Sequence, residues 1–295
     1  MGVRPLRVVA LGGGHGLAAT LAAARRYADD LCAIVSVADD GGSSGRLRAA
    51  FGIPPPGDLR KCLVALADPE SLWTSAFEHR FDAGELQGHA FGNLVLAGLA
   101  ASTGDFEQAL AEAGRLLGAV GRVVPATTEP VVLKAVVRGA NGDGGGSITG
   151  QVAVGSSEGI AGVSLVPADA RAPDAALAAL AQADQVVLGP GSLFTSVLAV
   201  VAVPMLRDAL ATTPGRKVYV CNLRPQLPET AGYDVADHVN ALRAHGLDID
   251  VVLCQPDSLP VGLLDIECVE RPVARPDGTG HDPALLAAAL QTLLN

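Results

Sequence analysis

The sequence predicts an α/β protein with a mainly parallel sheet flanked by helices. Apolar strand-like runs alternate with helical patterns along most of the chain, and glycine-rich turns follow several of the runs. Hydrophobic residues make up 49% of the 295 residues and aromatic residues only 3%, so small aliphatic side chains must fill the core. That composition suits a parallel sheet with helices on both faces.

The first elements form a βαβ unit. An apolar run at 8–11 predicts a strand, the Ala-rich stretch at 17–27 a helix, and the run at 32–37 a second strand. Residues 46–120 are mostly helical in pattern, with a break at the Pro-Pro-Pro-Gly turn of 54–57. We expect them to form a helical excursion over one face of the sheet.

The residue pattern changes between residues 122 and 167. Val and Thr alternate there, and the turn-rich segments NGDGGG (141–146) and GSSEG (155–159) interrupt the pattern. Short antiparallel strands are therefore expected rather than βα units. We treat the chain as a single α/β domain, 1–295, that carries this small β-rich insertion.

The α/β alternation then returns. Strands are expected at 185–188, 217–221 and 249–254, and helices at 173–182, from about 193, at 235–245 and at 283–294.

Composition excludes several classes of function. The formal net charge is −10 and no basic stretch marks a nucleic-acid surface. No uninterrupted apolar run is long enough for a membrane span, and residues 1–11 resemble a first strand rather than a signal peptide. The five cysteines show no CxxC spacing that would indicate zinc or a disulfide framework. We expect a cytoplasmic protein that neither enters a membrane nor binds nucleic acid.

The first candidate site is the loop LGGGHG at 11–16. Its glycines let backbone N–H groups approach a ligand, and the helix that follows favours a phosphate at its N-terminus. Gly13, Gly14, His15 and Gly16 are therefore candidate ligand-binding residues. GHGLAA at 14–19 also matches a degenerate dinucleotide fingerprint, which leaves a nicotinamide cofactor open. No GKS or GKT sequence supports a Walker-type NTPase.

A second glycine-rich loop follows the second strand. Asp39 and Asp40 precede GGSSG at 41–45, and their carboxylates, with the hydroxyls of Ser43 and Ser44, could hold sugar hydroxyls or a magnesium-bound diphosphate, or move a proton. Capping of a helix is the alternative role. A cationic cluster nearby could attract an anion or serve solubility; it comprises Arg46, Arg48, Arg60 and Lys61.

A third glycine-rich turn follows the strand at 185–188. It contains Pro190, Gly191 and Ser192, and Asn222 follows the next strand. The carboxyl ends of parallel strands line one crevice, so these residues are candidates for phosphate, base or sugar contacts. Ser192 could equally cap a helix, and Asn222 could form a turn. His89 is interpreted as structural, and no GxSxG or HExxH pattern supports a hydrolase.

Taken together, the motifs resemble one family. LGGGHG (11–16), ADDGGSSGRLR (38–48), PPGDLR (55–60), GHAFGNL (88–94), VLGPGSLFTS (187–196) and ETAGY (229–233) occur in order over nearly the whole chain. They are similar to the YvcK or gluconeogenesis-factor proteins, also called GlmR or CuvA, of the CofD-like superfamily. The resemblance implies a Rossmann-like CofD-type fold. It also adds Gly57, Asp58, Asn93 and Tyr233 to the ligand-binding candidates.

The function that the resemblance implies is regulatory. Such a protein would bind a UDP-sugar, UDP-N-acetylglucosamine or UDP-glucose, and would link carbon metabolism to peptidoglycan precursor supply and cell shape. We expect no catalytic residue and no required cofactor. A protein partner in amino-sugar synthesis and self-association through an Ala-rich surface helix are further expectations.

Two other functions remain open. Enzymatic CofD relatives transfer a phospholactyl group from a nucleotide-activated donor with magnesium, and Asp39 and Asp40 would correspond to their acidic pair and could hold Mg²⁺. An NAD(P)-binding oxidoreductase is the third candidate, although the sequence offers no recognisable Tyr-Lys pair.

The chain departs from the family pattern at the ligand loops. His15 stands where many members have Thr, and Gly280 stands where an Arg often precedes HDP. The loss of that Arg would remove a bidentate phosphate contact, which should affect ligand affinity more than the fold.

Overall fold

A computed structural model describes residues 4–138 and 145–294, so most of the NGDGGG turn predicted at 141–146 lies outside the described residues. The main sheet has seven strands in the order β10-β9-β8-β7-β1-β2-β3, and all its pairings are parallel. Its strands are β1 (Arg7–Gly12), β2 (Asp30–Val35), β3 (Arg122–Pro125), β7 (Gln185–Leu188), β8 (Arg216–Val220), β9 (Val251–Cys254) and β10 (Glu267–Glu270).

The sheet order divides at β1. The chain runs outward from β1 through β2 to β3, and later from β7, on the other side of β1, through β8 and β9 to β10. Leu11 of β1 lies in register with Ile34 of β2 and with Leu188 of β7. The loops that follow β1 and β7 therefore start side by side and lead away in opposite directions, which is the usual ligand-binding position in open parallel sheets.

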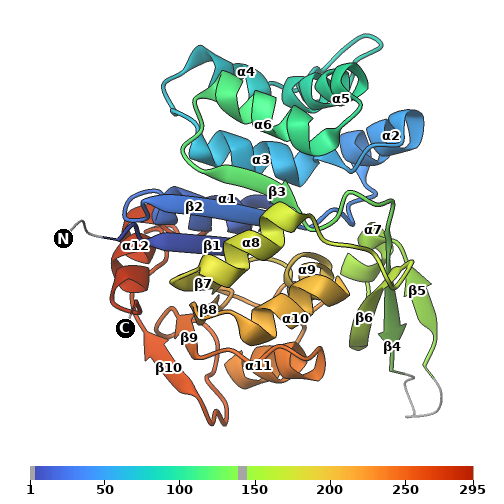
Figure 1. Cartoon of the computed structure of the whole chain (residues 1–295). Coiled ribbons are helices and arrows are strands. Elements are labelled where there is room, and N and C mark those ends of the chain that lie inside the picture. The colour runs from blue at the N-terminus through green and yellow to red at the C-terminus, as the bar shows by residue number, and fades with distance from the viewer. Residues whose placement is uncertain (1–3, 139–144, 295) are drawn as a thin grey trace.

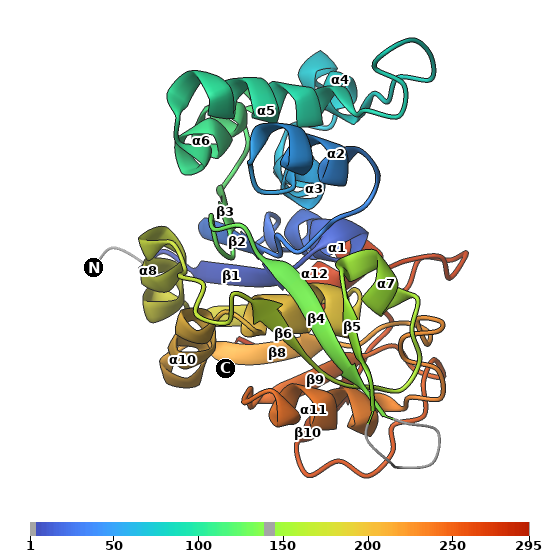
Figure 2. The same ribbon diagram turned by 90° about the vertical axis from the view of Figure 1, so that its right-hand side faces the viewer.

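Helices cover both faces of this sheet, as predicted. In Figure 1 and Figure 2, α1, α3 and α12 lie on one side, and α8, α10 and α11 on the other. The helical segments are α1 (Gly14–Ala24), α2 (Gly42–Phe51), α3 (Pro56–Leu66), α4 (Leu72–Glu78), α5 (Phe91–Thr103), α6 (Phe106–Leu117), α7 (Gln151–Gly155), α8 (Asp174–Gln182), the π-helical turn η1 (Leu193–Val197), α9 (Leu198–Val201), α10 (Pro204–Thr212), α11 (Val235–Ala244) and α12 (Pro283–Gln291).

The predicted helical excursion consists of α2 to α6, which stack above the β3 edge in Figure 1. The β-rich insertion is narrower than expected. Its three antiparallel strands are β4 (Val132–Val137), β5 (Ser147–Thr149) and β6 (Ile160–Val166), in the order β5-β4-β6. The segment at 122–125 belongs instead to the main sheet, because it pairs in parallel with β2.

The antiparallel sheet lies beside the carboxyl ends of the main strands, together with α7 (Figures 1 and 2). It can therefore contribute residues to a site at that edge. The sequence analysis missed β10, whose residues are exposed or half-buried because it forms the sheet's edge.

The core sits between the parallel strands and their helices. β7 and β9 are buried along their whole lengths, as expected for inner strands of a parallel sheet covered on both faces. Among the described residues, no single helix is long and apolar enough to cross a membrane. The bent pair Leu193–Val201 and Pro204–Thr212 meets those criteria only jointly, at an angle of 79°.

Candidate ligand-binding site

The two loops at the division of the sheet pack directly on each other. Gly16 comes so close to the second loop that a Cβ atom added there would lie 2.0 Å from the carbonyl oxygen of Pro190. The Gly189 N–H donates to Leu11 O at 3.0 Å, and the Thr20 hydroxyl donates to Gly189 O at 2.7 Å. Glycine at position 16 is therefore a requirement of the close approach between these loops.

Two adjoining cavities open at this point. The larger, of about 530 Å³, runs along α1 and is called here the α1 cavity. The smaller, of about 380 Å³, lies over the glycine loop and is called the loop cavity. Both have His15, Gly16, Gly191 and Gln226 in their walls, so one elongated ligand could occupy both. These volumes fall within the range of small-molecule sites.

The neighbouring carboxylates Asp39 and Asp40 have different positions. Asp39 lines the loop cavity, and its Oδ1 accepts the Gly41 N–H at 2.9 Å. Asp40 lines neither cavity, because its two oxygens accept the N–H groups of Gln151 and Val152 at 3.0 Å each and so cap α7. Burial raises the pKa of Asp39, and the negative charge of Asp58 raises it further.

Asp58 and Lys61 supply charge to the loop cavity from α3. Lys61 Nζ donates to Asp58 Oδ1 at 3.0 Å. Asp58 faces the glycine loop, since a Cβ atom on Gly13 would lie 2.7 Å from Asp58 Oδ2 and 3.2 Å from Ser196 Oγ. This wall therefore offers a cation, a carboxylate and a hydroxyl beside backbone amides.

The other candidates, in and around the second loop, form hydrogen bonds between helices and do not line the cavities. Ser44 Oγ accepts the Gly57 N–H at 3.1 Å. Ser43 Oγ contacts His89 Nδ1 at 3.0 Å and accepts from Asn93 Nδ2 at 3.1 Å. The side chains of Ser43, Ser44 and Asn93 are buried, and these residues and Gly57 line neither cavity. They join α2, α3 and α5 instead.

Of the predicted cationic cluster, Lys61 alone lines either cavity. Arg60 is buried and donates to Asn93 Oδ1 at 3.1 Å and to Phe77 O at 3.2 Å. Arg46 donates to the carbonyl of Gln87, and Arg48 to that of Val131. Arg60 and Arg46 therefore form contacts within the helical excursion, and Arg48 joins it to the segment before β4.

The loop after β7 is ordered by a buried carboxylate that the sequence analysis did not single out. Glu229 accepts from Ser192 Oγ at 2.6 and 2.7 Å and from the Phe194 N–H at 2.7 Å. Ser192 Oγ also accepts the Thr195 N–H at 2.9 Å and caps η1. Burial raises the pKa of Glu229, although these hydrogen bonds act in the opposite direction.

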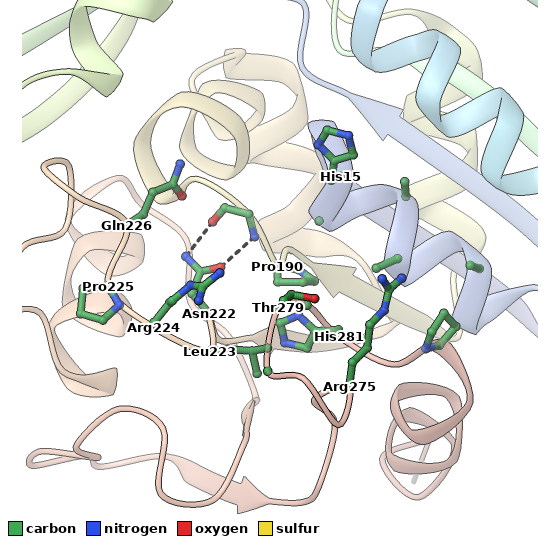
Figure 3. A pocket seen from close by; sticks show the side chains of 18 residues that line it. His15, Pro190, Asn222, Leu223, Arg224, Pro225, Gln226, Arg275, Thr279 and His281 are labelled. Atoms are coloured by element: carbon green, nitrogen blue, oxygen red, sulfur yellow. Dashed lines mark hydrogen bonds between the residues drawn. The ribbon is translucent and has the colours of Figure 1, made fainter. Parts of the chain in front are cut away.

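Asn222 fixes the same loop from β8. It exchanges two hydrogen bonds with the backbone of Gly191, at 3.0 and 2.9 Å (Figure 3). Asn222 lines the α1 cavity, but its amide is already paired with the protein backbone. Tyr233 lines neither cavity and packs edge-on against Phe194, with ring centroids 6.3 Å apart.

His15 lies at the junction of the two cavities, at the start of α1 (Figure 3). Partial burial lowers its pKa, and the nearby charge of Lys61 lowers it further. A neutral imidazole at this position can both donate and accept a hydrogen bond. Among the described residues, no group of three or more His, Cys, Asp or Glu side chains is placed to hold a metal ion. A Mg²⁺ ion would therefore need ligand phosphates in addition to Asp39.

Several cavity residues escaped the sequence analysis. Among them are Ser36, Ser196, Gln226, Arg275 and His281. Ser196 and His281 belong to the motifs VLGPGSLFTS and HDP, which was the only available signal. Arg275 lies outside any motif, in a segment whose position depends on tertiary contacts.

The pH dependence of stability tests whether His281 is buried in the wall of the α1 cavity. Burial lowers its pKa from the ordinary value of 6.5 to about 4. The folded protein thus keeps the ring neutral, whereas the unfolded chain takes up a proton near pH 6.5. The resulting stabilisation is complete above pH 6.5 and is lost as the pH falls toward 4. Urea unfolding at pH 7 and pH 5 should show that His281→Asn loses about 2 kcal/mol less stability than the wild type over this interval. Equal losses of stability in the wild type and in His281→Asn would show that burial does not lower the pKa of His281.

Comparisons with known proteins identify relatives of this chain in sequence and in fold. The sequence profile of a family described as 2-phospho-L-lactate transferase CofD matches residues 8–274. The chain is 40% identical to the gluconeogenesis factor of Bacillus subtilis, covering 88% of this chain and 81% of that protein. It is 42% identical to the gluconeogenesis factor of Halalkalibacterium halodurans, covering 81% and 73%. A crystal structure of a UPF0052-family protein from Bacillus halodurans superposes with a TM-score of 0.91 at 34% identity, covering 98% of this chain and 100% of that one.

Proposed function

The chain belongs to the CofD family, among relatives named gluconeogenesis factor, and on this premise we propose that it binds a UDP-sugar between the two glycine-rich loops. The observation that carries the proposal is the pair of adjoining cavities at the division of the sheet. Its two parts have different chemistry. The loop cavity presents backbone amides and Lys61, which suit a diphosphate, and the α1 cavity, of about 530 Å³, has a volume suited to a nucleoside.

The carboxylates of the loop cavity support the sugar end of the ligand. Asp39 and Asp58 both line it, together with the hydroxyls of Ser36 and Ser196. Carboxylates and hydroxyls are the groups that hydrogen-bond sugar hydroxyls. We therefore assign the sugar, UDP-N-acetylglucosamine or UDP-glucose being the first candidates, to this cavity. Mg²⁺ on Asp39 and the ligand phosphates is an optional part of the proposal.

Binding without turnover is the proposed mode of action. The protein would be a cytoplasmic regulator that reports the supply of nucleotide sugar to a protein partner in amino-sugar synthesis, and so links carbon metabolism to peptidoglycan precursors and cell shape. Calorimetric titration with UDP-N-acetylglucosamine and UDP-glucose, with and without Mg²⁺, tests the first step. No heat of binding at millimolar ligand would overturn it. Release of nucleotide from an activated phospholactate in the presence of a deazaflavin acceptor would instead identify a transferase.

Lys61→Ala should weaken UDP-sugar binding at least tenfold. A charged hydrogen bond contributes about 1.5–3 kcal/mol, and the variant would also leave Asp58 without its ion-pair partner beside the phosphates. Isothermal titration calorimetry measures the change. Lys217→Ala is the matched control, because Lys217 lies near the amino end of β8, away from the cavities. Equal affinities of the two variants would refute the phosphate assignment.

A further inference from the structure

A short hairpin forms part of the wall of the α1 cavity. Its base is fixed by Gln255, whose Oε1 accepts the N–H groups of Val273 and Ala274 at 2.8 and 2.9 Å. The Arg275 N–H donates to Gly280 O at 2.8 Å and closes the tip. The backbone that carries Arg275 is thus held in place by contacts within the protein.

Another part of the wall of the α1 cavity is an apolar face of α1. It consists of Ala18, Ala19 and Ala22, which lie on one side of the helix. Ala22 is seven residues beyond His15, which corresponds to about 10 Å along the helix axis. Figure 3 shows Arg275 beside α1, on the side away from His15. Arg275 therefore lines the same cavity as the alanine face, on the side away from His15.

Arg275 is exposed and forms no close ion pair in the described part of the chain, although the carboxylates of Asp277 and Asp282 are near enough to interact with its charge. In residues 4–138 and 145–294 no carboxylate lies within 4 Å of its guanidinium nitrogens. Asp277, two residues on, instead accepts hydrogen bonds from the N–H and hydroxyl of Thr279 at 2.9 and 2.8 Å. A planar cation and three alanine side chains of α1 thus line the same cavity.

We propose that Arg275 is a nucleobase-binding residue and that the base stacks between its guanidinium and the alanine face of α1. This inference rests on the proposed function and adds the direction of the ligand, with its base toward Arg275 and its phosphates toward Gly16. A planar guanidinium stacks on aromatic rings, and an ammonium cannot reproduce that contact. Phosphate contacts are available elsewhere, because Lys61, Gly13 and Gly14 line the loop cavity and Arg275 does not.

Titrations with ligands that contain or lack a base test the proposal. Arg275→Ala should raise the Kd for UDP and UDP-N-acetylglucosamine about tenfold, the scale of one base-stacking contact, and should leave pyrophosphate binding unchanged. Arg275→Lys should lose as much affinity as Arg275→Ala. Arg271→Ala is the matched control, since Arg271 is exposed and lies outside the cavity. Thermal denaturation of each variant checks that it is folded.

Three outcomes would overturn the base site. They are an unchanged Kd for UDP in Arg275→Ala, an equal loss of UDP and pyrophosphate binding, and full recovery in Arg275→Lys. The last two would make Arg275 a phosphate contact. The proposed function fails separately if the wild type binds no UDP-sugar. In that case UDP and ADP, titrated into the wild type and Arg275→Ala, still decide whether a base stacks there.

Discussion

Gly16→Ala is expected to destabilise the protein by about 3 kcal/mol or more and to abolish UDP-sugar binding. The added Cβ atom would lie 2.0 Å from Pro190 O and 2.9 Å from Gly191 N. Both are backbone atoms, so no side-chain rotation can relieve the overlap. The loops after β1 and β7 would have to separate, and the junction between the two cavities would be lost. Urea unfolding followed by fluorescence, with calorimetry for the ligand, measures both effects.

Gly98→Ala is the control for this substitution. Gly98 lies on an exposed turn of α5, and an added Cβ atom meets nothing within 4 Å. Alanine is preferred over glycine inside a helix, so this variant should gain about 0.5–1 kcal/mol. If both variants retained wild-type stability and binding, the close packing of the two loops would be refuted.

Glu229→Ala is expected to cost about 3 kcal/mol and to weaken UDP-sugar binding at least tenfold. Removal of the carboxylate leaves the buried Phe194 N–H without its acceptor, and leaves the Ser192 hydroxyl with Thr195 Oγ1 as its remaining side-chain partner. Each buried group that loses its partner costs about 1–3 kcal/mol. Affinity should fall as well, because Ser192 lines the loop cavity and Glu229 sets its position.

Two further variants isolate the role of Glu229. Glu229→Gln keeps one acceptor oxygen and should lose less than half as much stability as Glu229→Ala. Glu112→Ala removes an exposed glutamate that pairs with Arg115 at 2.8 Å, and should change stability by less than about 0.5 kcal/mol. A Glu229→Ala variant as stable as Glu112→Ala would show that the loop after β7 is held by other contacts.

The sequence was sufficient to locate the glycine loops because their signal is local. An apolar strand followed by glycines and a helical pattern identifies a strand end without knowledge of the partners of that strand. The same reasoning could not place the segment at 122–125, where Val and Thr alternation suggested an antiparallel strand. Its actual neighbour is β2, ninety positions earlier in the sequence, as the pairing of Cys32 with Arg122 shows.

Side-chain roles were harder to predict than loop positions. Asp39 and Asp40 are adjacent and chemically identical, and their roles differ because α7, 111 residues away, takes up the oxygens of Asp40. Arg275 and Gln226 lie in the cavity walls through tertiary contacts alone. By contrast, Gly13, Gly14, His15 and Gly16 were predictable and do line the cavities, since the end of β1 fixes them.

The position of the last hairpin and α12 also bears on how the proposed site is assembled. The α1 cavity has one wall from the first helix of the chain and another from residues 275–283, and α1 packs on α12. A chain in which residues 275–283 are not yet folded against α1 would have only part of this cavity. The proposed nucleotide binding would therefore require segments from both halves of the chain to be in place. A bound ligand would then add its binding free energy to the stability of the fold that joins them.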